Sequence, residues 1–175
     1  FIYNSTNFNF LEILFGWFFV SLLLVISLID IKYFWIPQSC INIGLLIGCL
    51  NLLFIQIINN LGQIDLFLNC ILTSLISFIL FELLRVSAKS FFKKDALGKG
   101  DSKLVSMMAL WLGSTGTILS LGISYIFAAF CLLIALKTKI IKRNQLVPFA
   151  PFLSFGGLVV WFFGNEFLIR NFLRY

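Results

Sequence analysis

Long apolar runs constrain this sequence more than any other feature. Residues 10–29, 40–58 and 66–84 are each about twenty residues long and almost free of charge, which is the length that an α-helix needs to cross a bilayer. Of the 175 residues, 61% are hydrophobic and 11% are charged, whereas a soluble domain has about 45–50% apolar and about 25% charged residues. A soluble fold of this size could not hide so much apolar surface, so the sequence predicts an all-α integral membrane protein.

The second half of the chain extends this pattern to a bundle of about six transmembrane helices. Residues 104–136 are an apolar run of 33 residues, which is too long for a single crossing. The stretch "GSTG" at 113–116 is the natural break and gives a short helix over 102–112 and a longer one over 117–136. A sixth helix begins near Pro148, and the tail, 164–175, is expected to form a short interfacial helix.

The distribution of positive charge favours six crossings with both termini outside. Of the 13 Lys and Arg residues, all but Arg170 and Arg174 lie in the loops 30–39, 85–103 and 137–147. Six crossings place these three loops on one side of the membrane, as the positive-inside rule expects for the cytoplasmic side. The net charge of +6 is therefore interpreted as adaptation to a lipid bilayer, and nucleic acid is not expected as a partner.

Residue types that are missing exclude several kinds of catalytic site. The sequence has no histidine, so a Ser/His or Cys/His nucleophilic arrangement is impossible. Its four cysteines form no C-x-x-C pair, which excludes a zinc site by local motif. We expect neither a metal nor a cofactor.

Two carboxylates differ from the rest. Asp30 ends an unbroken apolar helix and Asp101 opens another, where an ionisable group is expensive and needs a reason. Taken singly, Asp101 could be a helix N-cap and Asp30 could pair with Lys32. A third acid, Glu82, has Arg85 three residues later and is interpreted as a surface ion pair.

Taken together, Asp30 and Asp101 indicate a hydrolytic pair. The predicted topology puts both at the cytoplasmic boundary, although 71 residues separate them. Two adjacent carboxyl groups share one proton, so that one activates a water while the other donates to a carbonyl oxygen. Gly98 and Gly100 would let an extended peptide pass close to Asp101, since they lack a Cβ atom.

Three segments resemble the type IV prepilin peptidases. "DIKYFWIP" (30–37) resembles their first motif, "GKGDSKL" (98–104) is similar to their G-x-G-D signature, and "VPFAPFLSFGG" (147–157) is similar to the segment that opens their last helix. The resemblance covers nearly the whole chain in the right order and spacing. It implies a single prepilin-peptidase-like membrane domain over 1–175.

The resemblance implies an aspartyl endopeptidase of the prokaryotic cytoplasmic membrane, with its active site facing the cytoplasm. Such enzymes cut the basic leader from prepilins or pseudopilins after a glycine. Asp30 and Asp101 would be catalytic; the residues that would support the substrate loop or the structure are Gly98, Gly100, Lys103, Pro37, Pro148 and Pro151.

Two departures and several alternatives accompany this resemblance. The family often has Asp or Asn where this chain has Gln38, and an N-terminal region linked to methylation, often with C-x-x-C pairs, is absent before Phe1. We therefore expect either a truncated sequence or a version without methyltransferase activity. The alternatives are a small proton- or ion-coupled transporter that relays protons through the two aspartates, a non-catalytic subunit of a pilus or secretion machine, and a protease of the signal-peptide-peptidase kind.

Overall fold

Helices make up nearly all of this protein that the structure describes. The structure, a computed structural model, describes residues 10–58, 64–92, 98–139 and 147–172. Within these ranges there are no strands, which confirms the prediction of an all-α membrane protein of about six helices. The helices are α1 (Phe10–Tyr33), α2 (Gln38–Ile58), α3 (Ile64–Phe92), α4 (Lys99–Lys137), α5 (Ala150–Phe163) and α6 (Asn165–Phe172).

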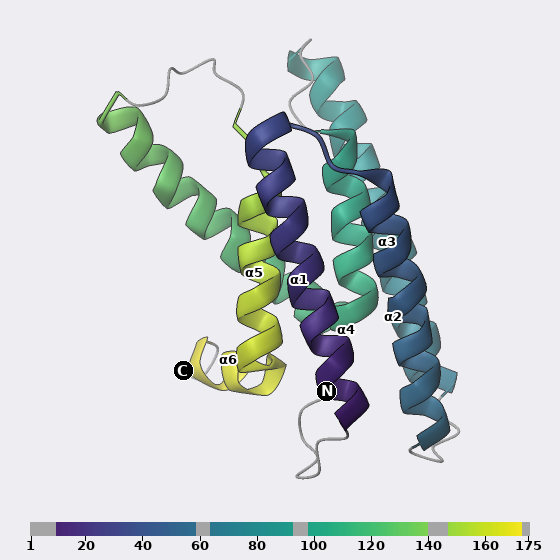
Figure 1. Ribbon diagram of the computed structural model, residues 1–175. Coiled ribbons are helices and arrows are strands. Elements are labelled where there is room, and N and C mark those ends of the chain that lie inside the picture. The colour runs from purple at the N-terminus through teal and green to yellow at the C-terminus, as the bar shows by residue number, and fades with distance from the viewer. Residues whose placement is uncertain (1–9, 59–63, 93–97, 140–146, 173–175) are drawn as a thin grey trace.

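The longest helix, α4, reverses direction at Gly113. Its 39 residues would extend about 58 Å as one straight helix, roughly twice the hydrocarbon thickness. Gly113 has φ 69° and ψ −175°, a conformation that only glycine adopts without strain. The chain therefore turns back there, and Figure 1 shows the two halves forming a V. The break lies inside the predicted 113–116 stretch, whereas Gly116 is buried within the second half.

Packing contacts establish how the two halves of α4 run. The first half, 99–112, pairs with α3 through a hydrogen bond between the hydroxyl of Ser74 and the carbonyl of Ser106 (2.8 Å). The second half, 114–137, packs along α5, where the hydroxyl of Ser124 approaches the carbonyl of Leu153 (3.4 Å). The sequence-based division of this region into two helices is thus confirmed.

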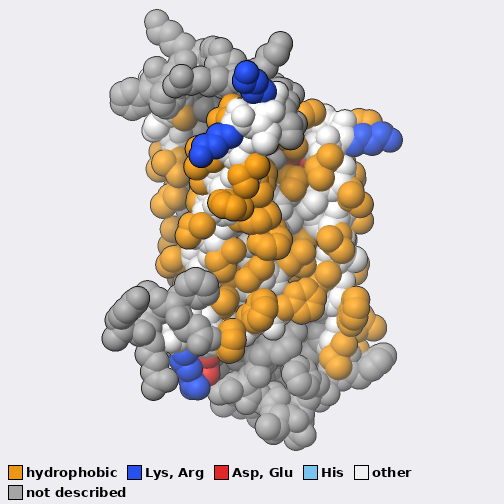
Figure 2. All heavy atoms as spheres, turned by 90° about the vertical axis from the view of Figure 1, so that its left-hand side faces the viewer, with side chains coloured by type: hydrophobic (Ala, Val, Ile, Leu, Met, Phe, Trp, Pro, Cys, Tyr) orange, Lys and Arg blue, Asp and Glu red, His pale blue; other side chains and the backbone are white. Residues whose placement is uncertain are grey.

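The outer surface is suited to lipid. In the described ranges, α1, α2, α3 and α4 are long and apolar enough to cross a membrane, while α5 is apolar but shorter. Figure 2 shows hydrophobic side chains over the middle of one face and Lys or Arg side chains towards its ends. Large side chains such as Trp17 and Ile126, each more than 70% exposed, are therefore expected to face acyl chains.

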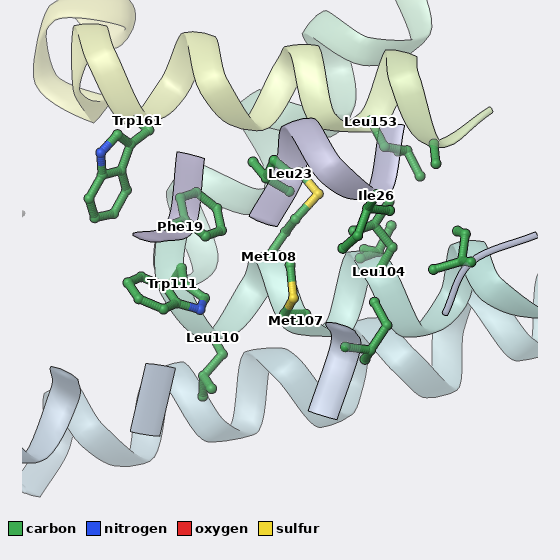
Figure 3. Packing of buried hydrophobic residues seen from close by; sticks show 14 of the residues in the cluster. Phe19, Leu23, Ile26, Leu104, Met107, Met108, Leu110, Trp111, Leu153 and Trp161 are labelled. Atoms are coloured by element: carbon green, nitrogen blue, oxygen red, sulfur yellow. The ribbon is translucent and has the colours of Figure 1, made fainter. Parts of the chain in front are cut away.

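Aromatic residues fill the interior near the turn in α4. Phe19 of α1 stacks on Trp111 of α4, with 4.9 Å between ring centroids, and Trp161 of α5 packs edge-on against Trp111 at 6.0 Å. The indole N–H of Trp111 donates to the carbonyl of Gly44 in α2 (3.0 Å). Figure 3 shows how this cluster continues through Met108. The core thus joins α1, α2 and α5 to the first half of α4.

One end of the bundle collects the predicted site. There α1 and α3 end, α2 and α5 begin, and α4 both begins and ends (Figure 1). We call it the basic end, because Lys32, Lys99, Lys103 and Lys137 lie there. The predicted placement of the three basic loops on one side agrees with this arrangement.

Helix boundaries differ from the predicted ones. Helix α1 continues past Asp30 to Tyr33, and α3 continues past residue 84 to Phe92, because no Gly or Pro interrupts either segment. Helix α5 begins at Ala150, two residues after Pro148. Within the predicted tail, Asn165–Phe172 form helix α6, whereas residues 173–175 lie outside the described residues; its position at the membrane interface stays a prediction.

Candidate active site

Asp30 is a buried carboxylate in the last turn of α1. Only 6% of the residue is exposed. Its Oδ2 accepts a hydrogen bond from the backbone N–H of Ala150, the first residue of α5, at 3.1 Å. Lys32, the partner that the sequence suggested, lies instead over the ring of Tyr33 at 5.2 Å. The contact with α5 therefore replaces the expected surface pair.

Two prolines set the start of α5 and so place the donor for Asp30. Pro148 disfavours helical geometry in the residue before it, and α5 begins just after it, with Phe149 as N-cap. Pro151 occupies a first-turn position, where the missing N–H is tolerated. The N–H of Ala150 is unpaired within the helix, as all first-turn donors are, and it points at Asp30. The positive end of the α5 dipole thus faces this carboxylate.

Asp101 is the second buried carboxylate, in the first turn of α4. It is 7% exposed, and its Oδ2 accepts a hydrogen bond from the N–H of Gly98 at 3.2 Å. The N-cap of α4 is Gly98, so the alternative that Asp101 is itself the N-cap is wrong. Asp101 stands at the third helical position, from which its carboxylate accepts the N–H of the N-cap residue and closes the start of the helix. Gly98 itself is extended, with φ −69°.

The two aspartates lie at the same end of the bundle, and no other charged side chain whose exposure the structure describes is buried. Asp30 is near enough to influence Asp101 electrostatically. Their backbones stay apart, because no Cα atom of α1 lies within 8 Å of one in α4. Each carboxylate accepts a hydrogen bond from a different backbone N–H: that of Ala150 for Asp30 and that of Gly98 for Asp101. The arrangement is thus a pair of separately anchored acids.

The segment between α1 and α2 packs on the first turn of α4. A Cβ atom on Gly100 would lie 2.8 Å from the Cβ of Ile36, so the absence of a side chain at Gly100 admits Ile36. This packing role was not foreseen from the sequence, and the passage of a substrate beside the glycines stays a prediction. Pro37 directly precedes α2, and its carbonyl accepts from the N–H of Ile41 (3.4 Å).

Lys103 joins the first turn of α4 to the first turn of α2. Its ammonium group donates to the side-chain oxygen of Gln38. Gln38, which stands where the prepilin peptidase pattern often has Asp or Asn, is therefore the partner of Lys103, which fits that pattern. An amide oxygen serves here as an acceptor for Lys103.

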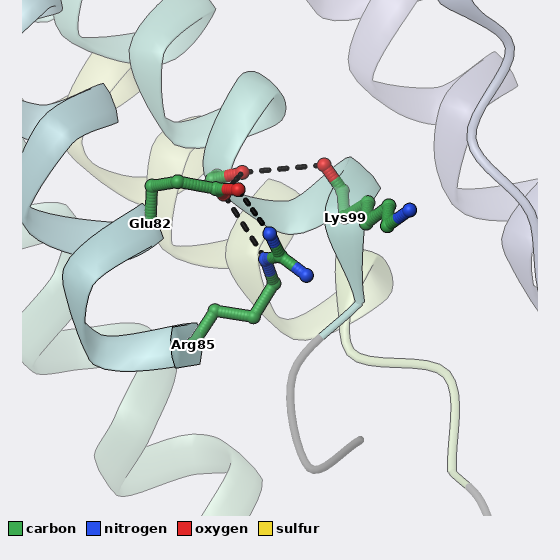
Figure 4. Close-up of polar contacts among 4 residues, drawn as sticks. Glu82, Arg85 and Lys99 are labelled. Atoms are coloured by element: carbon green, nitrogen blue, oxygen red, sulfur yellow. Dashed lines mark hydrogen bonds and ion pairs between the residues drawn. The ribbon is translucent and has the colours of Figure 1, made fainter. Parts of the chain in front are cut away.

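Sequence reasoning missed one contact beside Asp101. Glu82 and Arg85 form the expected ion pair on α3, and Figure 4 shows them next to the start of α4, near Lys99. The carboxylate of Glu82 also accepts a hydrogen bond from the hydroxyl of Ser102 at 3.2 Å. The spacing of three residues predicted the Glu82–Arg85 ion pair. The hydrogen bond from Ser102 to Glu82 could not be predicted, because it depends on how α3 and α4 pack.

Metal ligands do not cluster in the described residues: over 10–58, 64–92, 98–139 and 147–172, no group of three or more His, Cys, Asp or Glu side chains could hold a metal ion. The chemistry available at the basic end is therefore considered from the two carboxyl groups and their backbone donors.

Comparison with known proteins connects this geometry to a family. Residues 17–134 match the model of the type IV leader peptidase family. A prepilin leader peptidase/N-methyltransferase of Legionella pneumophila is 29% identical over 169 residues, which is 95% of this chain and 56% of that protein.

Two further relatives are similar over shorter stretches. One is a type 4 prepilin-like proteins leader peptide-processing enzyme of Escherichia coli, 33% identical over 78% of this chain and 46% of its own. The other is a prepilin leader peptidase/N-methyltransferase of Xanthomonas campestris, 34% identical over 50% of this chain and 30% of its own. The chain thus spans about half the length, or less, of the curated relatives it matches. No solved structure matches it.

Proposed function

The chain belongs to the type IV leader peptidase family, and from this premise we propose that it removes the basic leader peptide from type IV prepilins or pseudopilins. Asp30 and Asp101 are the two catalytic carboxyl groups in this proposal. Cleavage follows a glycine, as the resemblance to prepilin peptidases implies.

One observation carries the proposal. Among the charged side chains whose burial the structure describes, only Asp30 and Asp101 are buried, and helices far apart in sequence bring them to one end of the bundle. Burying a carboxylate is unfavourable unless other groups compensate for the lost water. Two buried carboxylates at one end of the bundle therefore suggest a functional role. General acid–base catalysis of hydrolysis is a role that two such carboxyl groups can perform.

The reaction needs only a water molecule and these two groups. With one proton shared between them, the ionised carboxylate takes a proton from water, and the water oxygen attacks the carbonyl carbon of the scissile peptide bond. The protonated carboxyl group donates to the carbonyl oxygen as the tetrahedral intermediate forms. When the C–N bond breaks, the proton taken from water passes to the departing amine, and one hydroxyl proton of the intermediate returns to the carboxylate that had protonated the carbonyl oxygen. The products are a carboxylic acid and an amine, and the pair again holds one proton. The apolar surroundings strengthen these electrostatic interactions.

The hydrogen bonds from Ala150 and Gly98 fit this scheme. Each occupies one oxygen of its carboxylate, Oδ2 in both cases, and leaves the other oxygen for water or substrate. Both donors belong to the start of a helix, where the dipole stabilises negative charge. The anchors thus orient the acids before substrate binds, which lowers the reorganisation needed during reaction.

The membrane orientation follows from the basic end. Positive residues concentrate on the cytoplasmic side of membrane proteins, so the basic end and the two aspartates face the cytoplasm of a prokaryotic cell in this proposal. A leader with its own positive charge would then be cut where it is made.

The test replaces one carboxylate at a time. Asp30→Asn and Asp101→Asn keep a side-chain oxygen for the N–H of Ala150 or Gly98, so the fold is expected to persist, but neither amide can exchange a proton in the required way. Each variant is co-expressed with a prepilin, and the mass of the product reports the bond cut and any added methyl group. We expect the rate of leader removal to fall by at least about 10²-fold.

The matched control is Glu166→Gln, which removes a carboxylate at the opposite end of the bundle, where Glu166 pairs with Arg170 at 3.8 Å. It is expected to cleave at the unmodified rate. Near-normal cleavage by either aspartate variant would overturn the assignment. Proton flux in liposomes that Asp101→Asn abolishes, without any peptidase activity, would favour a transporter instead.

A further inference from the structure

The turn of α4 that carries Asp101 is attached to α3 through a shared carboxylate oxygen. Oε2 of Glu82 accepts a hydrogen bond from Nε of Arg85 (3.1 Å). The hydroxyl of Ser102 lies 3.2 Å from the same Oε2 and 3.2 Å from the carbonyl oxygen of Lys99, and it shares its proton between these two acceptors. Ser102 directly follows Asp101 in the chain. Figure 4 shows the carboxylate of Glu82 between Arg85 and the start of α4.

This contact is shielded from solvent on the α4 side. Ser102 is 1% exposed, and Asp101 is 7% exposed. The side chain of Arg85 is 15% exposed and that of Glu82 is 34% exposed. A hydrogen bond to an ionised group is stronger than a neutral one, and more so where water is scarce. The hydrogen bond between Ser102 and Glu82 is therefore expected to restrain the start of α4.

We propose that Glu82 is a positioning residue for Asp101 and that it acts through the hydroxyl of Ser102. Arg85 fixes the carboxylate of Glu82 by a two-point contact, and Glu82 in turn fixes the turn that carries Asp101. The inference rests on the proposed function, because it concerns the geometry of the proposed catalytic pair.

Two comparisons within the chain separate this contact from an ordinary ion pair. Glu166 and Arg170 form an exposed pair on α6, 3.8 Å apart, and no hydrogen bond joins Glu166 to another described helix. On the other flank, Lys103 contacts Gln38 of α2. Ser102 and Lys103, the two residues that follow Asp101, thus attach its turn to α3 and to α2, and the carboxylate anchor is on α3.

The effect of losing the anchor should appear in catalysis rather than in binding. A displacement of about 1 Å in a catalytic group lowers rates by up to about 10²-fold. Ser102→Ala removes the hydroxyl and leaves the Glu82–Arg85 pair intact, so kcat for leader removal is expected to fall about tenfold to a hundredfold. KM should stay within about twofold, because no group that binds the substrate is changed.

The experiment is a double-mutant cycle on the purified chain in detergent, with a purified type IV prepilin as substrate. Ser102→Ala, Glu82→Ala and the double variant are compared for kcat and KM. If Glu82 acts through Ser102, the double variant loses little more kcat than either single one. Glu82→Gln keeps one oxygen that can accept from Ser102 but loses the charge and one of the two contacts with Arg85, so it is expected to have a kcat between those of Glu82→Ala and the parent.

Matched controls are Ser87→Ala, an exposed serine of α3, and Glu166→Ala. Both should leave kcat and KM unchanged. Thermal unfolding of every variant is followed in parallel, and a kcat loss that merely tracks lowered stability across the series would overturn the proposal.

Other outcomes also decide the question. Unchanged kcat in Ser102→Ala would overturn the positioning role, as would losses of Ser102→Ala and Glu82→Ala that simply multiply. A rise in KM with unchanged kcat in Glu82→Ala would assign Glu82 to binding the basic leader and reject positioning. The proposed function fails separately, if Asp30→Asn or Asp101→Asn retains full cleavage.

Discussion

Replacing Gly156 with alanine tests how closely α5 must pack on the second half of α4. A Cβ atom at Gly156 would lie 2.1 Å from the hydroxyl oxygen of Ser124 and 2.3 Å from the carbonyl oxygen of Ser120. The hydroxyl can rotate away, but the carbonyl belongs to the α4 backbone. To restore an ordinary contact of 3.4 Å, α5 and the second half of α4 must move apart by about 1.1 Å (3.4 − 2.3).

The magnitude follows from a comparison with Gly122, in the second half of α4, where an added Cβ would meet no atom within 4 Å. Alanine is favoured over glycine inside a helix by about 1 kcal/mol in both places. The difference in the free energy of unfolding between the two variants therefore isolates the overpacking at Gly156, about 1–3 kcal/mol.

The assay is equilibrium unfolding in mixed micelles with increasing denaturing detergent. Gly122→Ala is expected to be at least as stable as the parent, and Gly156→Ala less stable than Gly122→Ala by the amount above. Equal stability of the two variants would refute the reasoning that close backbone contact holds α5 in place. Because α5 carries Ala150, the donor to Asp30, leader removal by Gly156→Ala is also expected to slow.

Three further substitutions probe other parts of the same architecture. Trp111→Phe removes the 3.0 Å hydrogen bond to the carbonyl of Gly44 and should lower the free energy of unfolding by about 1–2 kcal/mol; unchanged detergent unfolding would contradict this. Gly100→Ala places a Cβ 2.8 Å from that of Ile36 and should lower the rate of leader removal about tenfold or more, as a prepilin assay would show. Gly113→Ala imposes an L side chain on φ 69° and should cost about 1–3 kcal/mol of stability, measurable in the same detergent titration.

The transmembrane layout was accessible from sequence because the bilayer sets a fixed length scale. The apolar run of 104–136 exceeded that length, and glycine at 113 offered a place to turn. The ends of the helices could be predicted less well, because a helix can continue beyond the hydrocarbon region of the bilayer. Helix α3 thus runs on to Phe92 through residues that favour or tolerate helix.

The site was accessible only in outline. Unusual carboxylates and charge asymmetry placed Asp30 and Asp101 at one end, but their partners depend on packing across helices. The N–H of Ala150 is a backbone donor with no sequence signature, and the hydrogen bond from Ser102 to Glu82 requires α3 and α4 to meet in one register. That Asp30 and Asp101 act in catalysis stays a prediction.

The turn at Gly113 has a consequence for how the protein is made. The apolar stretch around it must leave the insertion machinery as a hairpin, both arms in the lipid, instead of threading through as one over-long span. A chain that failed to double back would deliver residues 147–157 to the opposite compartment, and Ala150 could never meet Asp30. The backbone freedom of Gly113 therefore favours the doubled-back path that brings Ala150 to Asp30.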